Sequence, residues 1–164
     1  MRWLVAAAVI ALPASAFAYG EADDQDRPGA QERGLHVLTN QVREDPHAWP
    51  GWDTSLASGE ARGPLLLHAS LFEAARFHAD DMHDADCFTH ESCDGTSFQA
   101  RLSRYFGGPA GENIYFAVGD DSARSAGTAW RNSDGHRRNI LEPSWTDLGT
   151  GFADAREFYY VQNF

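Results

Sequence analysis

Residues 147–164, which read DLGTGFADAREFYYVQNF, decide the fold of this 164-residue chain. Two runs in this stretch, Asp147–Ala153 and Glu157–Phe164, are separated by a short turn, and the pattern predicts two paired strands. Side chains alternate between the two faces of a strand. In the second run, one face therefore carries Phe158, Tyr160, Gln162 and Phe164, and the other carries Tyr159, Val161 and Asn163.

Upstream of this hairpin, apolar residues recur at helical spacing in four stretches. These stretches begin near Glu32, Ser70, Thr96 and Asp121 or Ser122. Ser70 with Glu73, and Thr96 with Gln99, have the spacing of capping boxes, which mark helix starts. Ile114–Val118 is apolar and aromatic and is expected to be extended. Helices interleaved with a few short strands indicate an α+β domain with a small antiparallel sheet.

Length and composition exclude several classes of protein. The length suits one domain, with or without an appendage, and 43% hydrophobic residues are enough to exclude a fully disordered chain. The formal net charge is −11. A surface of this charge repels phosphate backbones, so we expect no nucleic-acid partner.

Residues 1–18 have the features of a secretory signal peptide. Arg2 is basic, Leu4–Leu12 is an unbroken apolar run, and Ala16-Phe17-Ala18 is a small–x–small cleavage pattern. An uncleaved anchor is the alternative, although the run is shorter than the roughly 20 residues of a membrane span. We expect a secreted or periplasmic monomer with no membrane span after cleavage.

Residues 19–31 are acidic, contain Pro and Gly, and show no apolar periodicity. This composition is typical of a flexible lead-in. The folded domain is then expected to occupy residues 32–164.

Cys87 and Cys93 are six residues apart, and a local disulfide is expected in an exported protein. Such a bridge would hold the intervening residues, including His90, in one shape. Two free thiols, or a metal site formed by both Cys with His90, are the alternatives.

Three polar segments place a His or a Glu beside turn-forming residues, at Phe88–His90, Gly111–Ile114 and Gly135–Leu141. Imidazoles are good ligands for zinc or copper, and a carboxylate can be a third ligand or a general base. One interpretation of these segments is that His90, Glu112 and His136, each in a turn, meet in one cleft. Hydrogen-bonded turn residues without a shared site are the alternative. His78 is expected to be a hydrogen-bonded core or cleft-edge residue.

The same segments belong to an ordered series that resembles the CAP superfamily, or SCP domain, which includes cysteine-rich secretory proteins, antigen 5 and pathogenesis-related proteins 1. The resemblance is closest to the bacterial secreted SCP-like branch and covers roughly Glu32 to Phe164. The matching pieces are His78–Met82, Phe88–His90, Asp94-Gly95, Arg101, Gly111–Ile114, Trp130, Ser133–Arg137, Asn139–Leu141, Gly149, Gly151 and Tyr160–Phe164.

The resemblance implies a three-layer α-β-α sandwich with an open cleft. The family's cleft carries two His and two Glu, which in some members bind a divalent metal. His90, Glu112 and His136 match three of these four positions, whereas Ser133 occupies the position of the second Glu. The resemblance thus implies a weak, open site for zinc or copper at His90 and His136, with Glu112 as a further candidate ligand.

The function expected from these features is a non-enzymatic extracellular binding domain whose ligand is a lipid, a glycan or a protein surface. The alternative is a metal- or His-dependent, protease-like hydrolase in which Glu112 is the general base and His90 and His136 are the other candidate catalytic residues. A third possibility is a metal-sequestering protein. Fold resemblance alone does not choose among these functions.

Overall fold

The computed structural model describes residues 27–46, 60–119, 122–154 and 157–164. The expected signal peptide at 1–18 and the lead-in up to residue 26 lie outside these ranges. In chain order the elements are α1 (Ala30–Glu44), β1 (Leu66–Leu67), α2 (Ala69–Asp84), α3 (Phe98–Leu102), β2 (Glu112–Val118), α4 (Ala123–Asn132), α5 (Asp134–Leu141), β3 (Asp147–Asp154) and β4 (Glu157–Asn163).

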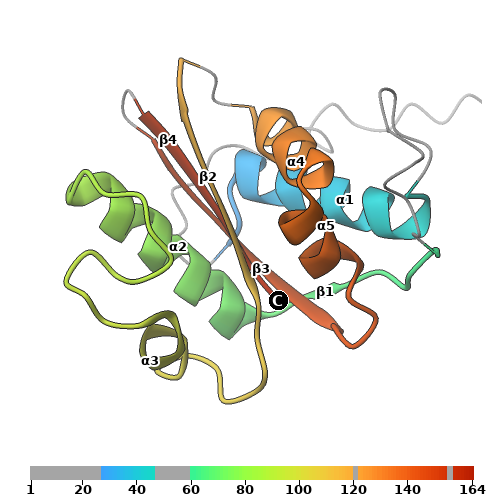
Figure 1. Ribbon diagram of the computed structural model, residues 1–164, viewed down its shortest axis with the longest axis horizontal. Coiled ribbons are helices and arrows are strands. Elements are labelled where there is room, and N and C mark those ends of the chain that lie inside the picture. The colour runs from blue at the N-terminus through green and yellow to red at the C-terminus, as the bar shows by residue number, and fades with distance from the viewer. Residues whose placement is uncertain (1–26, 47–59, 120–121, 155–156) are drawn as a thin grey trace, which may run out of the picture.

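The four strands form one sheet in the order β1-β3-β4-β2. Strand β4 pairs antiparallel with both β3 and β2, and the two-residue β1 pairs parallel with β3. Helices α2 and α3 lie on one side of the strands, and α1, α4 and α5 lie on the other (Figure 1). The α+β class and the three-layer arrangement are therefore confirmed.

The two faces of β4 belong to two separate parts of the core, as the alternation in its sequence predicts. Tyr160 and Phe164 pack with Trp130 on the α1–α4 side. Tyr159 and Val161 pack against α2 on the opposite side. The last strand is thus buried on both faces and joins the outer layers.

Two glycines of β3 let α2 lie directly on the sheet. A Cβ atom at Gly149 would stand 2.0 Å from the Leu71 carbonyl carbon, and one at Gly151 would stand 2.2 Å from the Ala75 carbonyl oxygen. Backbone atoms of a helix cannot move aside as a flexible side chain can. Gly149 and Gly151 therefore set the distance between α2 and the sheet.

Several expected boundaries differ from the structure. Helix α1 begins at Ala30, inside the expected lead-in, because the Glu32 carboxylate accepts a hydrogen bond from the Gly29 N–H. The capping boxes at Ser70 and Thr96 are wrong, since the residues that cap α2 and α3 are His68 and Ser97.

Ser97 accepts a hydrogen bond from the Ala100 N–H, as an N-cap residue does. None of the helices within the described ranges is long and apolar enough to cross a membrane.

Candidate functional site

Glu112, the first residue of β2, is the centre of a buried hydrogen-bond network. Its Oε1 atom accepts from His90 Nδ1 at 3.0 Å, and its Oε2 atom accepts from Arg101 Nη2. The side-chain amide nitrogen of Asn163 also donates to Oε2 at 3.0 Å, while its amide oxygen accepts from the Ala75 N–H of α2 at 3.1 Å. The Glu112 side chain is only 2% exposed. Both oxygens of this carboxylate are therefore engaged inside the protein.

Strand register and one short helix bring these groups together. Glu112 lies directly opposite Asn163 in the β2–β4 pair. Arg101, in the last turn of α3, is fully buried and donates from Nη1 to both His78 Nδ1 and the His90 carbonyl oxygen, each at 2.9 Å. Arg101 thus connects α2, the loop that carries His90, and β2.

His78 of α2 is a hydrogen-bonded core residue, as the sequence analysis expects. The residue is fully buried, and its Nε2 atom lies 2.9 Å from the Thr89 carbonyl oxygen. Because Arg101 donates to Nδ1, Nε2 carries the proton and donates to Thr89. Burial lowers the pKa of His78 to about 4, so the ring is neutral near pH 7.

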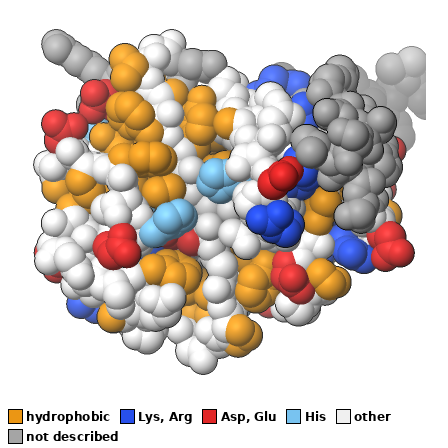
Figure 2. Space-filling view, viewed as in Figure 1, with side chains coloured by type: hydrophobic (Ala, Val, Ile, Leu, Met, Phe, Trp, Pro, Cys, Tyr) orange, Lys and Arg blue, Asp and Glu red, His pale blue; other side chains and the backbone are white. Residues whose placement is uncertain are grey.

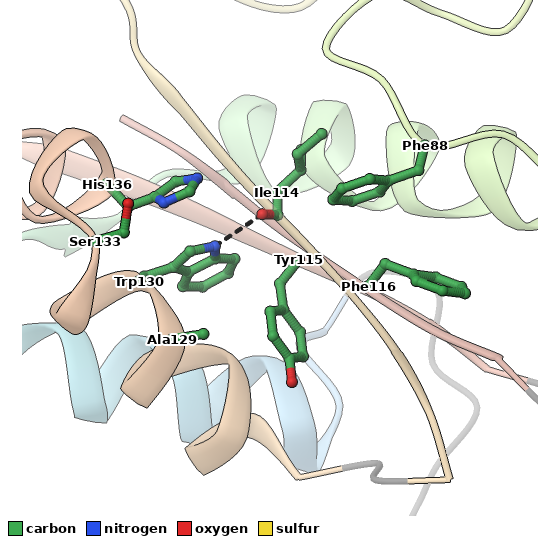
Figure 3. Close-up of a pocket in the computed structure, with 8 residues that line it drawn as sticks. All are labelled: Phe88, Ile114, Tyr115, Phe116, Ala129, Trp130, Ser133 and His136. Carbon is green, nitrogen blue, oxygen red and sulfur yellow. Dashed lines mark hydrogen bonds between the residues drawn. The ribbon is translucent and has the colours of Figure 1, made fainter.

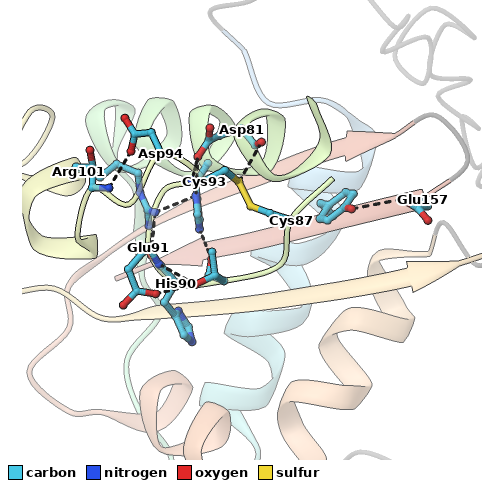
Figure 4. The surroundings of a disulfide bond; sticks show 12 residues. Asp81, Cys87, His90, Glu91, Cys93, Asp94, Arg101 and Glu157 are labelled. Carbon is cyan, nitrogen blue, oxygen red and sulfur yellow. Dashed lines mark hydrogen bonds and ion pairs between the residues drawn. A yellow bond between two sulfur atoms is a disulfide. The ribbon is translucent and has the colours of Figure 1, made fainter. Parts of the chain in front are cut away.

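The disulfide predicted between Cys87 and Cys93 is confirmed. It closes the loop between α2 and α3, and the Cys93 N–H donates to Asp81 Oδ2 at 2.9 Å (Figure 4). The loop is thus fastened both to itself and to α2. His90 lies within it, as expected, and its side chain is 51% exposed.

His136 and Glu112 are not in turns, contrary to the sequence prediction. His136 lies on α5, a helix absent from the sequence prediction, because Ser133-Asp134-Gly135 has the composition of a helix end rather than of a helix start. Ser133 instead joins two consecutive helices, with an extended backbone between them. A polar helix of eight residues with little apolar periodicity resembles a loop when it is judged from sequence alone.

His136 is half-buried and lies within electrostatic range of His90. Desolvation lowers the pKa of His136, and the charge on His90 lowers it further. The Nδ1 atom of His136 is buried and has no hydrogen-bond partner among the described residues. Figure 2 shows two histidine side chains next to each other near the centre of this face.

An amide ladder that the sequence analysis gave no role fixes α5 on β2. Asn139 Nδ2 donates to the Glu112 carbonyl oxygen and to Asn113 Oδ1, both at 3.0 Å. Asn113 Nδ2 in turn donates to the carbonyl oxygen of His136 at 3.2 Å. The available signal was that both residues lie in segments that resemble the CAP pattern, Gly111–Ile114 and Asn139–Leu141. Their polar type alone does not reveal such a role.

An apolar pocket of about 290 Å³ adjoins His136 (Figure 3). It lies along β2, between the disulfide loop on one side and helices α4 and α5 on the other. Phe88 on its rim is 51% exposed. The lining residues are Phe88, Ile114, Tyr115, Phe116, Ala129, Trp130, Ser133 and His136.

Within the described ranges, no group of three or more His, Cys, Asp or Glu side chains is arranged to hold a metal ion. Glu112 already accepts from Arg101, His90 and Asn163. Of the three predicted site residues, Glu112 is thus engaged inside the protein, whereas the His90 side chain is exposed and His136 lines the apolar pocket.

Comparison with known proteins identifies the family of this chain. The model of the cysteine-rich secretory protein family, CAP, matches residues 37–164. The chain belongs to the CAP family. YkwD of Bacillus subtilis (strain 168) is 36% identical over 103 residues, which cover 60% of this chain and 38% of YkwD.

Solved structures of CAP proteins share the fold. An extracellular SCP-domain protein of Bacillus anthracis superposes with a TM-score of 0.63 at 32% identity, over 82% of this chain and 39% of that one. NaASP2, solved with Zn²⁺, superposes with a TM-score of 0.54 at 17% identity, over 85% of this chain and 81% of that one. This CAP chain thus spans well under half of the length of YkwD and of the B. anthracis protein. Its membership of the CAP family fits a secreted protein.

Proposed function

We propose that this CAP domain is a secreted, non-enzymatic binding domain whose cleft takes an extracellular ligand. The observation that carries the proposal is the state of Glu112, which is buried and hydrogen-bonded at both carboxylate oxygens. A general base must have a lone pair within reach of the water that it activates. The two Glu112 oxygens instead accept hydrogen bonds from His90 and Arg101 and hold them in place. This arrangement argues against a hydrolase in which Glu112 is the general base.

The pocket beside His136 supports a binding role. Ligand sites are concave and mostly apolar, with a few polar groups that orient the ligand. Aromatic side chains line this pocket, and His136 Nδ1 is a buried polar atom without a partner among the described residues. A ligand with an apolar group and a hydrogen-bonding group matches that lining.

We further propose that His90 and His136 bind a divalent metal such as zinc or copper weakly. His90 donates from Nδ1 to Glu112, the arrangement in which a carboxylate orients a metal-binding imidazole, and Nε2 is then the ligand atom. The zinc in the NaASP2 structure supports this idea for the fold. With two protein ligands the affinity should be low, and Glu112 would contribute through His90.

Calorimetric titration with zinc near pH 7.5 and near pH 5 tests the metal site. We expect His90→Ala and His136→Ala each to weaken binding at the higher pH, and His83→Ala, at the far end of α2, to leave it unchanged. Since Glu112 raises the pKa of His90, protons should displace the metal as the pH falls. Unchanged binding by both cleft variants would eliminate the shared site.

The binding function is tested by filling the pocket. Ala129 lies on α4 in the pocket wall, so Ala129→Leu should narrow it. We expect the apolar dye anilinonaphthalene sulfonate to bind the native chain and to bind this variant more weakly. Turnover of peptide or ester substrates by the native chain, lost in a Glu112→Gln variant that is shown to remain folded, would instead establish the hydrolase.

Export and domain boundaries complete the proposal. Removal of residues 1–18 would leave a monomer that begins at Tyr19, with the CAP domain starting at α1, which begins at Ala30. Intact-mass measurement of the exported chain tests the cleavage, and a full-length mass would contradict it.

A further inference from the structure

The outer edge of β2 has an orientation that the strand register determines. Gly111 and Phe164 exchange both of their backbone hydrogen bonds just before the β2–β4 pairing begins. In an antiparallel pair, hydrogen-bonded and non-hydrogen-bonded positions alternate. The N–H and C=O groups of Glu112, Ile114, Phe116 and Val118 therefore point away from β4, towards the outside of the sheet.

Helix side chains cover one half of this edge. Asn139 Nδ2 donates to the Glu112 carbonyl oxygen at 3.0 Å, and Trp130 Nε1 donates to that of Ile114 at 2.9 Å. For the outward groups of Phe116 and Val118, the described part of the chain supplies no hydrogen-bond partner. Side chains of α4 and α5 thus cover the edge at Glu112 and Ile114. At Phe116 and Val118, the backbone N–H and C=O groups of the edge remain available to a partner.

The apolar pocket lies against the same edge. Figure 3 shows Ile114 and Phe116 on β2, with Phe88 on one side and Ala129 and Trp130 on the other. Phe88 is 51% exposed, and Val118 at the open end is 69% exposed. An extended chain beside β2 would place alternate side chains towards this pocket.

The open end is also acidic. Val118 pairs with Glu157, whose carboxylate lies 3.4 Å from the Tyr159 hydroxyl. Burial raises the pKa of Tyr159, and the negative charges of Glu157 and Asp86 raise it further. Asp86 therefore lies within electrostatic range of the Tyr159 hydroxyl, as Glu157 does. With a chain net charge of −11, this end of the edge favours a cationic partner.

We propose that an extended basic peptide segment of another protein adds as a strand to the open edge of β2 at Phe116–Val118 and inserts an apolar side chain into the pocket. The mode is β-strand addition, in which backbone hydrogen bonds supply affinity and the pocket supplies specificity. The inference rests on the binding function proposed above and specifies its ligand class.

A probe for this site is the acetylated, amidated peptide KVKFKVK, titrated by calorimetry against the full chain. Val118→Pro removes one outward N–H without touching the β2–β4 hydrogen bonds, and edge strands tolerate Pro. Leu67→Pro is the matched control, because Leu66 and His68 donate to β3 and the Leu67 N–H points away at the opposite edge. We expect Val118→Pro to weaken binding about tenfold or more and Leu67→Pro to leave it within about twofold.

Two further peptides keep the test decisive if Val118→Pro fails to fold. One carries N-methyl groups on alternate amides, and the other has Glu in place of each Lys. Both should bind the native chain at least about tenfold more weakly. Equal binding by the native chain and Val118→Pro, or by the acidic and basic peptides, overturns the inference. Dye binding to the pocket without peptide binding overturns the inference alone, whereas absence of both overturns the proposed function as well.

Discussion

Arg101 and Glu112 form an ion pair in which both side chains are almost completely buried, at 0% and 2% exposure. The two residues come from α3 and β2, and the pair is the point where the disulfide loop, α2 and the sheet meet. A buried pair is costly to break on one side, because the remaining charge is left without compensation.

Arg101→Met and Glu112→Gln should therefore each lower the free energy of unfolding by about 3–5 kcal/mol. The double variant should lose clearly less than the sum, since it leaves no unpaired buried charge. Urea unfolding of the four proteins measures this coupling. If the loss in the double variant equals the sum of the two single losses, Arg101 and Glu112 are not energetically coupled and the prediction is wrong.

The stability of the domain should depend on pH through His78. Its folded-state pKa is about 4, whereas the unfolded chain has the ordinary value of about 6.5. Between these values only the unfolded state binds the proton, so the free energy of unfolding falls as the pH falls through this window, by about 3 kcal/mol at most.

His78→Gln, which can still accept from Arg101 and donate to Thr89, should flatten this dependence. His90 acts in the opposite direction, because its hydrogen bond to Glu112 raises its pKa. Its stabilising contribution is present at low pH and is lost as the pH rises through the folded-state pKa. Urea unfolding between pH 4 and pH 7, with His90→Ala for comparison, separates the two. An unchanged slope in His78→Gln would exclude His78 as the cause.

Removal of the disulfide should cost about 2 kcal/mol of stability, because the closed loop is short. We expect the Cys87→Ser/Cys93→Ser variant to remain folded but to hold His90 less firmly. In the native chain, the NMR line width of the His90 ring should be that of an ordered residue. Identical His90 spectra with and without the bridge would show that Arg101 and Glu112 suffice to hold the loop.

Gly149→Ala and Gly151→Ala should each destabilise the domain by more than about 3 kcal/mol, since a Cβ would enter the backbone of α2. Gly135→Ala on α5 is the control, because the added Cβ meets nothing within 4 Å. Alanine also favours helix over glycine by up to about 1 kcal/mol, so this variant should be slightly more stable. Thermal melts that rank the three variants otherwise would refute the packing described for β3.

The sequence by itself determined the elements whose patterns are local. The alternation in 157–164 predicts which faces of β4 are buried, and the apolar stripes predict α1, α2 and α4 to within a few residues of their ends. The spacing of Cys87 and Cys93, together with the expectation of export, predicts the disulfide. These features depend on neighbours in the chain, so periodicity and turn residues are sufficient to find them.

Other features were decided only by the tertiary structure. Helix α5 has too little apolar periodicity to be found from sequence, and it is held on β2 by the amides of Asn113 and Asn139. The partners of Glu112 come from α3, the disulfide loop and β4, at separations from 11 to 51 residues. No local rule specifies which buried polar groups will meet, because that depends on strand register and on the close approach that Gly149 and Gly151 allow. The same register turns Phe116 and Val118 outward and leaves their backbone groups at an open edge.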